Sequence, residues 1–172
     1  EVLLGLAGHL KDDEHIHVIG GMKEDITFWT KKFNENNVSD KITFHGYYQH
    51  TYVHSFLEQM NVLLLPIQSR VTVYGGGGNI ASYTSPLKMF EYMTSGTPIV
   101  ASKLPVLQEI LTHNVNSILV KYDNIQDWYK AIEKLRVDVS LSEFISKTAK
   151  EEMNQKYTWE IRVKNILSEL NI

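Results

Sequence analysis

The amino-acid sequence predicts an α/β protein organised as a doubly wound parallel sheet. Helical and strand patterns alternate along its 172 residues, which is the order that gives a parallel sheet with helices on both faces. Residues 62–65 (VLLL) form a continuous apolar run, as expected of a strand covered on both faces. Glycine follows the first two strand patterns, at Gly20, Gly21 and Gly46, where the chain must turn sharply.

The predicted strands are short apolar runs that end at Gly, Pro or a loop. They cover residues 15–19, 41–45, 62–65, 99–101 and 117–120. The segments between them place apolar residues at the 3.6-residue spacing of amphipathic helices. These helices are expected at residues 1–11, 23–37, 50–60, 85–95, 107–111, 125–136, 141–155 and 158–172.

The loops that follow the strands are expected to form one ligand-binding rim. In a doubly wound sheet, ligands bind beyond the carboxyl ends of the strands. The loops concerned are residues 20–22, 46–49, 66–86 and 102–106. Residues 67–84 include four consecutive glycines, and we expect this long stretch to be mobile and to lie beside the site.

Composition excludes several classes of protein. The net charge of −3 gives no basic surface for nucleic acid, and the absence of cysteine excludes disulfides and thiolate metal sites. No apolar run is long enough to cross a membrane. Because the chain has no signal-peptide pattern, we expect it in the cytoplasm. We expect one domain over residues 1–172, and the absence of an initiator Met suggests a piece of a longer protein.

Residues 84–102 (TSPLKMFEYMTSGTPIVAS) carry the most informative pattern. Ser85 is a good N-cap, and Pro86 suits the first position of a helix, where its missing N–H costs nothing. Gly96 is predicted to end this helix as a left-handed cap. A short apolar strand then follows.

Lys88 does not fit a purely structural helix start. The third helical position prefers Glu or Gln, and a cation there opposes the helix dipole by about 0.3–1 kcal/mol. A bound anion would reverse this effect, because the N–H groups of Leu87 and Lys88 and the Lys88 ammonium would all hold a phosphate. Glu91, one turn later, could accept hydrogen bonds from a ribose diol. The alternative is a solvated Lys88–Glu91 ion pair.

Other patterns give weaker indications. His50 and His54 have the spacing of a zinc pair, but without a third ligand nearby a solvated helix face is expected, and no metal site is predicted. Tyr47 and Tyr48 follow a strand and could stack on a base. No G-x-S-x-G or G-x-G-x-x-G pattern occurs, so neither a hydrolase nucleophile nor a dinucleotide site is predicted.

The motifs SPLKMFEYM (85–93) and SGTPIVAS (95–102) closely resemble one family. They look like the C-terminal, donor-binding domain of retaining glycosyltransferases of the GT-B fold, family 4 (glycosyl transferases group 1), in the branch with an SPLK-F-E-Y-M motif. The runs VIGG (18–21), ITFHG (42–46), NVLLLP (61–66) and YTWE (157–160) support the resemblance. It covers nearly the whole chain and implies a Rossmann-like domain.

The resemblance also implies a substrate and assigns residues to it. The substrate would be a UDP-sugar or GDP-sugar, from which a hexose is transferred with retention, without a cofactor and without a metal bound to the protein. Residues Ser85, Pro86, Leu87 and Lys88 would face the diphosphate, Glu91 would bind the ribose, and Tyr47 and Tyr48 would border the base. Loops near the sugar and phosphates would contain Gly20, Gly21, Gly77, Gly78 and Tyr83. No catalytic residue is assigned.

The sequence departs from the family pattern in two ways. Tyr83 stands where many members have a Glu near the donor sugar. Members also begin this domain with a strand and a basic pair that are lacking here, as is the acceptor-binding N-terminal domain. We therefore expect a chain that is inactive alone, whose glycan or lipid-linked acceptor is bound by the missing domain. Peripheral membrane association of the whole enzyme is a further expectation.

Two other functions remain open from the sequence. A nucleotide-sugar epimerase of the GT-B fold would share the diphosphate site, but should group His, Asp and Glu on the rim. A non-catalytic nucleotide-binding module, or a regulatory α/β domain, would need only part of the site. A receiver-like regulatory domain should cluster acidic residues at the strand ends, and the sequence offers no such cluster.

Overall fold

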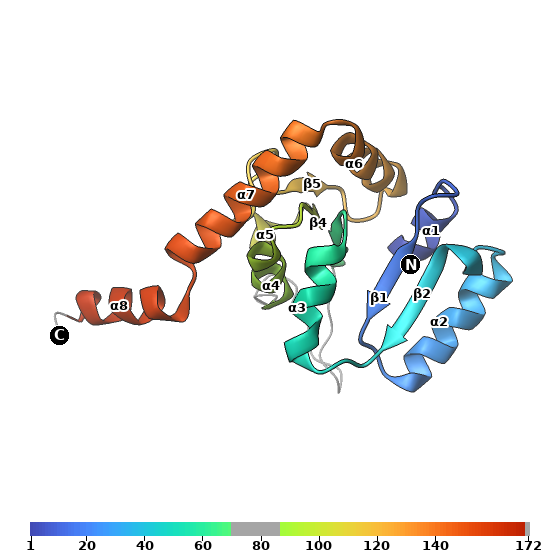
Figure 1. Cartoon of the computed structure of the whole chain (residues 1–172), viewed down its shortest axis with the longest axis horizontal. Coiled ribbons are helices and arrows are strands. Elements are labelled where there is room, and N and C mark those ends of the chain that lie inside the picture. The colour runs from blue at the N-terminus through green and yellow to red at the C-terminus, as the bar shows by residue number, and fades with distance from the viewer. Residues whose placement is uncertain (70–86, 171–172) are drawn as a thin grey trace.

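The computed structural model describes residues 1–69 and 87–170, and its elements alternate as the sequence predicts (Figure 1). The strands are β1 (Ile16–Ile19), β2 (Ile42–Gly46), β3 (Leu63–Leu65), β4 (Ile99–Ser102) and β5 (Ile118–Val120). The helices are α1 (Val2–Ala7), α2 (Lys23–Glu35), α3 (His50–Gln59), α4 (Leu87–Ser95), α5 (Pro105–Gln108), α6 (Ile125–Val137), α7 (Val139–Lys156) and α8 (Trp159–Glu169). A 3₁₀ turn, η1 (Ser39–Lys41), precedes β2.

Two boundaries differ from the sequence prediction for clear reasons. The first helix ends at Ala7 instead of continuing to residue 11, because two glycines within four residues, Gly5 and Gly8, weaken its helix propensity. The helix predicted at 107–111 begins earlier, at Pro105, which occupies the favoured first helical position. The remaining boundaries agree within a few residues.

All strand pairs are parallel, but the hydrogen-bonded sheet is divided in two. β1 pairs with β2, whereas β3, β4 and β5 form a second sheet in that order. The sequence predicts one sheet, with a first strand missing. Within the described residues, β1 and β3 each pair on one side only.

One hydrophobic core nevertheless supports both sheets. It contains Ile16 and Ile42 from the first sheet, and Val100 and Ile118 from the second. Helices α1 and α6 complete it, with Leu6 and Trp128 fully buried. The two sheets therefore share one covered face although no ladder joins them among the described residues.

A second core covers the other face of β4. Ile99 and Ala101 pack there with Met89 and Met93 of α4 and with Ala149 of α7. Because Val100 points into the first core, β4 is buried on both faces, with every residue fully or nearly fully inaccessible. This is the arrangement expected of a central strand in a doubly wound fold.

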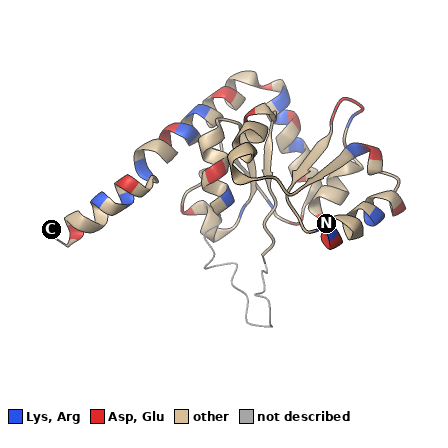
Figure 2. Ribbon diagram, turned by 60° about the horizontal axis from the view of Figure 1, so that its bottom comes forward, with Lys and Arg blue, Asp and Glu red and all other residues tan. Residues whose placement is uncertain are grey.

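Charged side chains of both signs are mixed along the outer helices, most visibly on α7 and α8 (Figure 2). α8 extends away from the rest of the molecule (Figure 1) and is capped by the Thr158 side chain, which accepts a hydrogen bond from the Ile161 N–H. Across residues 1–69 and 87–170, no helix has the length and apolarity that crossing a membrane requires.

Candidate functional site

Glycines shape the carboxyl ends of β1 and β2. Gly20, Gly21 and Gly46 all have positive φ, at 102°, 94° and 72°, which other residues adopt only with strain. The Gly20 N–H donates a 2.7 Å hydrogen bond to the Gly46 carbonyl, so the two turns hold each other in place. A Cβ on Gly20 would meet no atom within 4 Å, so the backbone here borders open space. Of the glycines predicted to lie near a ligand, Gly21 is exposed and Gly20 is half-buried, both directly after β1.

The loop after β2 presents two tyrosines in different ways. The side chain of Tyr47 is 82% exposed, whereas that of Tyr48 is 38% exposed. The Tyr48 ring packs edge-on against Phe56 of α3, with ring centroids 4.8 Å apart. Tyr47 therefore has a free ring face for stacking, while Tyr48 mainly fixes the loop to α3.

The start of α4 presents a cation to solvent. Leu87 and Lys88 are exposed in its first turn, and no ion pair joins Lys88 to Glu91. The sequence-based alternative, a solvated pair between these two side chains, is therefore not formed. Ser85, Pro86, Gly77, Gly78 and Tyr83, together with all of the loop predicted to be mobile except residues 67–69, lie outside the described residues.

Glu91 contacts a residue to which the sequence assigned no role. Its Oε1 lies 3.1 Å from Nε2 of His50, the first residue of α3. This contact joins the segment after β2 to the helix that follows β3, and so connects the rim of one sheet to that of the other. His54 points to a separate partner, Glu58 of the same helix, at 3.3 Å. Both histidines are exposed, as expected of a solvated helix face. The contact of His50 with Glu91 was not expected.

The surroundings of Glu91 affect a neighbouring tyrosine. Burial of the Tyr92 hydroxyl raises its pKa, and the negative charge of Glu91 raises it further. The face of α4 that carries Tyr92 is thus packed against the core, whereas Lys88 and Glu91 face solvent. The first two turns of α4 therefore present an exposed cation, Lys88, and a carboxylate, Glu91, that contacts His50 of α3.

Three histidines line the surface of β1 and β2 that faces away from the shared core. His17 Nδ1 lies 2.9 Å from His45 Nε2, and the ring of His15 lies tilted beside that of His17, with centroids 4.9 Å apart. Desolvation by burial lowers the pKa of His17, as do His15 and His45. Among the described residues no group of His, Asp or Glu is placed to hold a metal ion.

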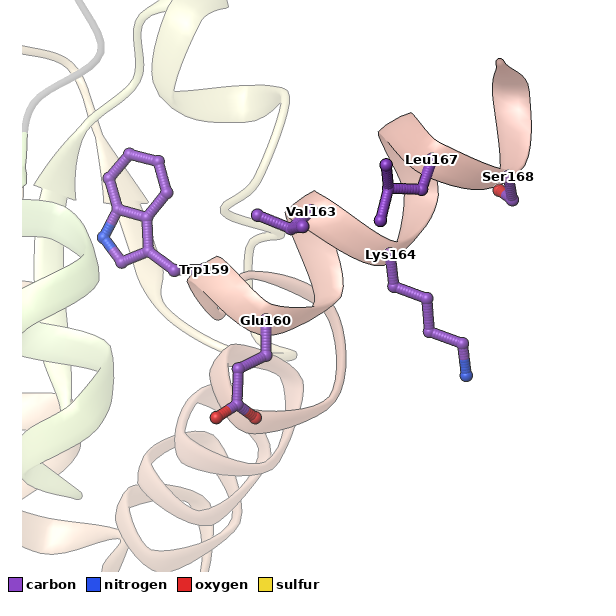
Figure 3. Close-up of a pocket in the computed structure, with 6 residues that line it drawn as sticks. All are labelled: Trp159, Glu160, Val163, Lys164, Leu167 and Ser168. Carbon is purple, nitrogen blue, oxygen red and sulfur yellow. The ribbon is translucent and has the colours of Figure 1, made fainter. Parts of the chain in front are cut away.

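A hollow along α8 lies away from this rim (Figure 3). Its lining comes from one helix only, with Trp159, Val163 and Leu167 beside Glu160, Lys164 and Ser168. Trp159 is 76% exposed, and the helix offers no opposing wall. The hollow is an open helix face and lacks the enclosure of a small-molecule site.

The fold and rim define an α/β domain of the class that binds ligands at the carboxyl ends of parallel strands. Residues 2–138 match the family described as "Glycosyl transferases group 1", and the chain belongs to this family. A relative called an uncharacterized glycosyltransferase, from Methanocaldococcus jannaschii, is 28% identical over 123 residues, which are 72% of this chain and 28% of the relative.

Solved structures identify the fold as the C-terminal half of a GT-B glycosyltransferase. Anabaena HepE in complex with UDP superposes with a TM-score of 0.80 at 14% identity, over 99% of this chain and 44% of HepE. The C-terminal domain of the group 1 protein LpcC from Francisella tularensis gives 0.70 at 19%, over 92% and 78% of the two chains. A complex of S. aureus TarM gives 0.72 at 21%, over 99% and 32%. The chain therefore spans less than half of HepE and TarM.

Proposed function

We propose that this chain is the donor-binding half of a retaining glycosyltransferase that transfers a hexose from a UDP-sugar or GDP-sugar to a glycan or lipid-linked acceptor. One observation carries the proposal: an exposed lysine in the first turn of α4, on the rim where α/β domains of this family's fold bind ligands. HepE is solved with UDP and with UDP-glucose, and the TarM complex contains UDP and an α-GlcNAc-glycerol. These complexes favour a uridine nucleotide for this chain too.

The chemistry of transfer fits this rim. Negative charge develops on the leaving diphosphate as the bond from the sugar to the phosphate breaks. The Lys88 ammonium and the free N–H groups at the start of α4 would stabilise that charge. Glu91 would accept hydrogen bonds from the ribose hydroxyls, and the free face of Tyr47 would stack on the base. Gly20 and Gly21 would let the backbone approach the phosphates.

The acceptor would bind to protein outside these 172 residues, because the chain spans only 44% of HepE. We therefore expect donor binding without turnover by this chain alone. The complete enzyme would act in the cytoplasm, with peripheral contact to a membrane where its acceptor is a lipid.

Isothermal titration calorimetry with UDP, GDP, UDP-glucose and GDP-mannose tests the proposal. Binding of one nucleotide family, with the free diphosphate and its sugar competing for one site, is the expected result. Absence of binding by every one of these ligands would contradict it. Incubation of the bound sugar nucleotide, followed by chromatography, separates the alternatives: an epimerase would convert the sugar, whereas a donor-binding half would leave it unchanged.

A further inference from the structure

The contact between His50 and Glu91 has no role in the function proposed so far. The imidazole Nε2 and the carboxylate Oε1 are 3.1 Å apart, across two helices and 41 residues of sequence. The His50 side chain is 83% exposed and that of Glu91 37% exposed. An exposed pair of this kind contributes little to stability. Its significance therefore lies in where it holds the carboxylate.

The two helices are fixed relative to each other independently of this pair. The Thr97 hydroxyl, just after α4, donates a 2.8 Å hydrogen bond to the Leu57 carbonyl of α3, and both residues are buried. Phe56, the neighbour of Leu57 on α3, contacts Tyr48 and so fixes the loop that precedes the helix. His50 thus stands at a defined position opposite the second turn of α4, and it can hold a side chain there without itself setting the fold.

Glu91 has a competing partner on its own helix. Lys88 lies three residues earlier, which is a spacing at which oppositely charged side chains pair. In the structure Glu91 turns to His50 instead, and Lys88 and Glu91 form no ion pair. The contact with His50 therefore keeps the ammonium available to another anion. It also occupies one carboxylate oxygen, Oε1, and leaves Oε2 to accept further hydrogen bonds.

We propose that His50 is a positioning residue for the nucleotide: it holds Glu91 toward the ribose and away from Lys88, so that both side chains can bind the same donor. This inference rests on the proposed function. The imidazole Nε2–H donates to Oε1, and the ribose hydroxyls donate to Oε2. Lys88 remains free for the diphosphate. Without His50, Glu91 would turn to Lys88, and each of the two would lose its ligand contact.

Ribose discrimination is the measurement that isolates this role. We would titrate the chain with UDP and with 2′-deoxy-UDP, or with the guanine pair if GDP binds more tightly, and compare the two dissociation constants. Wild type should bind the deoxy ligand about three- to tenfold more weakly, the effect of one hydrogen bond. His50→Phe should weaken UDP binding by a similar factor and bring the ratio of the two constants close to one.

Two further variants complete the experiment. His54→Phe changes the next histidine of the same helix, which contacts Glu58, and should leave both constants unchanged. His50→Gln, whose amide can still donate to Glu91, should restore most of the ribose discrimination. Circular dichroism should show the same thermal midpoint for all variants, since both histidines are exposed on the helix surface.

The outcomes separate the inference from the function on which it rests. If UDP binds but His50→Phe retains the wild-type ratio of constants, His50 does not position Glu91, and the proposed function still stands. A loss of UDP affinity with an unchanged ratio contradicts the inference in the same way. If wild type binds neither UDP nor GDP, the proposed function fails and the role of His50 fails with it.

Discussion

The hydroxyl of Thr97 donates a 2.8 Å hydrogen bond to the backbone carbonyl of Leu57, 40 residues earlier in the chain. Both residues are buried, and the bond connects the segment just before β4 to the last turn of α3. It fixes the helix that follows the first sheet against an element of the second sheet. This buried hydrogen bond therefore helps to set the distance between the rim loops of the first sheet and those of the second.

Replacing Thr97 by Val should destabilise the protein. The isosteric change removes the donor to Leu57 and leaves a buried carbonyl with only the Met60 N–H, at 3.3 Å. The expected loss is about 1–2 kcal/mol in the free energy of unfolding, measured by urea titration. Thr51→Val, on the exposed surface of α3, is the control and should change it by less than about 0.5 kcal/mol. Equal effects of the two changes would show that the buried bond contributes nothing.

Reversing the charge of Lys88 should abolish diphosphate binding while leaving the fold intact. Lys88→Glu places a carboxylate at the positive end of α4, where it would repel the phosphates but suit the helix dipole. We expect at least about a tenfold loss of UDP affinity by calorimetry, with no loss of thermal stability. Lys164→Glu on α8, away from the rim, should leave the affinity unchanged. An unaltered affinity in Lys88→Glu would refute the role assigned to this residue.

Gly96→Ala should be costly, because Gly96 ends α4 with a φ of 78°. Left-handed backbone costs an L-residue about 1–2 kcal/mol, and the new Cβ would also lie 3.4 Å from Cδ of Lys150. Gly8→Ala provides the matched control, since Gly8 ends α1 with a φ of −69°. That change should be neutral or should stabilise by about 0.5–1 kcal/mol. Thermal unfolding of both variants measures the contrast, and a reversed order would exclude the left-handed cap.

The stability of the protein should fall at low pH partly through His113. Desolvation by burial lowers the pKa of His113, as do Lys134 and Lys103, while its Nδ1 accepts a hydrogen bond from the Leu119 N–H at 3.0 Å. Because the folded pKa lies below the ordinary value of 6.5, the neutral ring stabilises the fold above that pH. This stabilisation is lost as the pH falls through the folded pKa, when Nδ1 becomes protonated and can no longer accept.

Urea unfolding of His113→Leu between pH 5 and about 8 tests this sign. Wild type should exceed the variant in unfolding free energy near neutral pH, and the difference should shrink toward the acidic end. A difference that grows as the pH falls would mean that the charged ring is the stabilising form.

Most of the fold follows from local patterns in the sequence. Apolar runs such as residues 62–65 locate the strands, and Gly96 ends α4 in the predicted left-handed conformation. The division into two sheets was not predicted, because strand pairing depends on which backbones meet in space. A hydrophobic pattern shows that β1 and β3 are strands but does not show whether they are neighbours.

The candidate site is predictable to a smaller extent. The exposure of Lys88 follows from its place in the first turn of α4. His50 could not be found in this way, because its partner lies 41 residues away on another helix. The i, i+4 spacing of His50 and His54 led to the prediction of a solvated helix face, which is correct for their exposure but does not reveal that His50 contacts Glu91. Tyr47 and Tyr48 look equivalent in sequence, and only packing against Phe56 distinguishes them.

The divided sheet has a mechanical consequence for the rim. Gly20, Gly46 and Tyr47 belong to the part of the chain built on β1 and β2, whereas Lys88 and Glu91 belong to the part built on β3, β4 and β5. In the described residues no ladder of backbone hydrogen bonds resists a sliding motion between the two. A nucleotide held by Tyr47 on one side and Lys88 on the other would span the boundary between the two sheets. Its binding would therefore stiffen the domain, as a cross-link does.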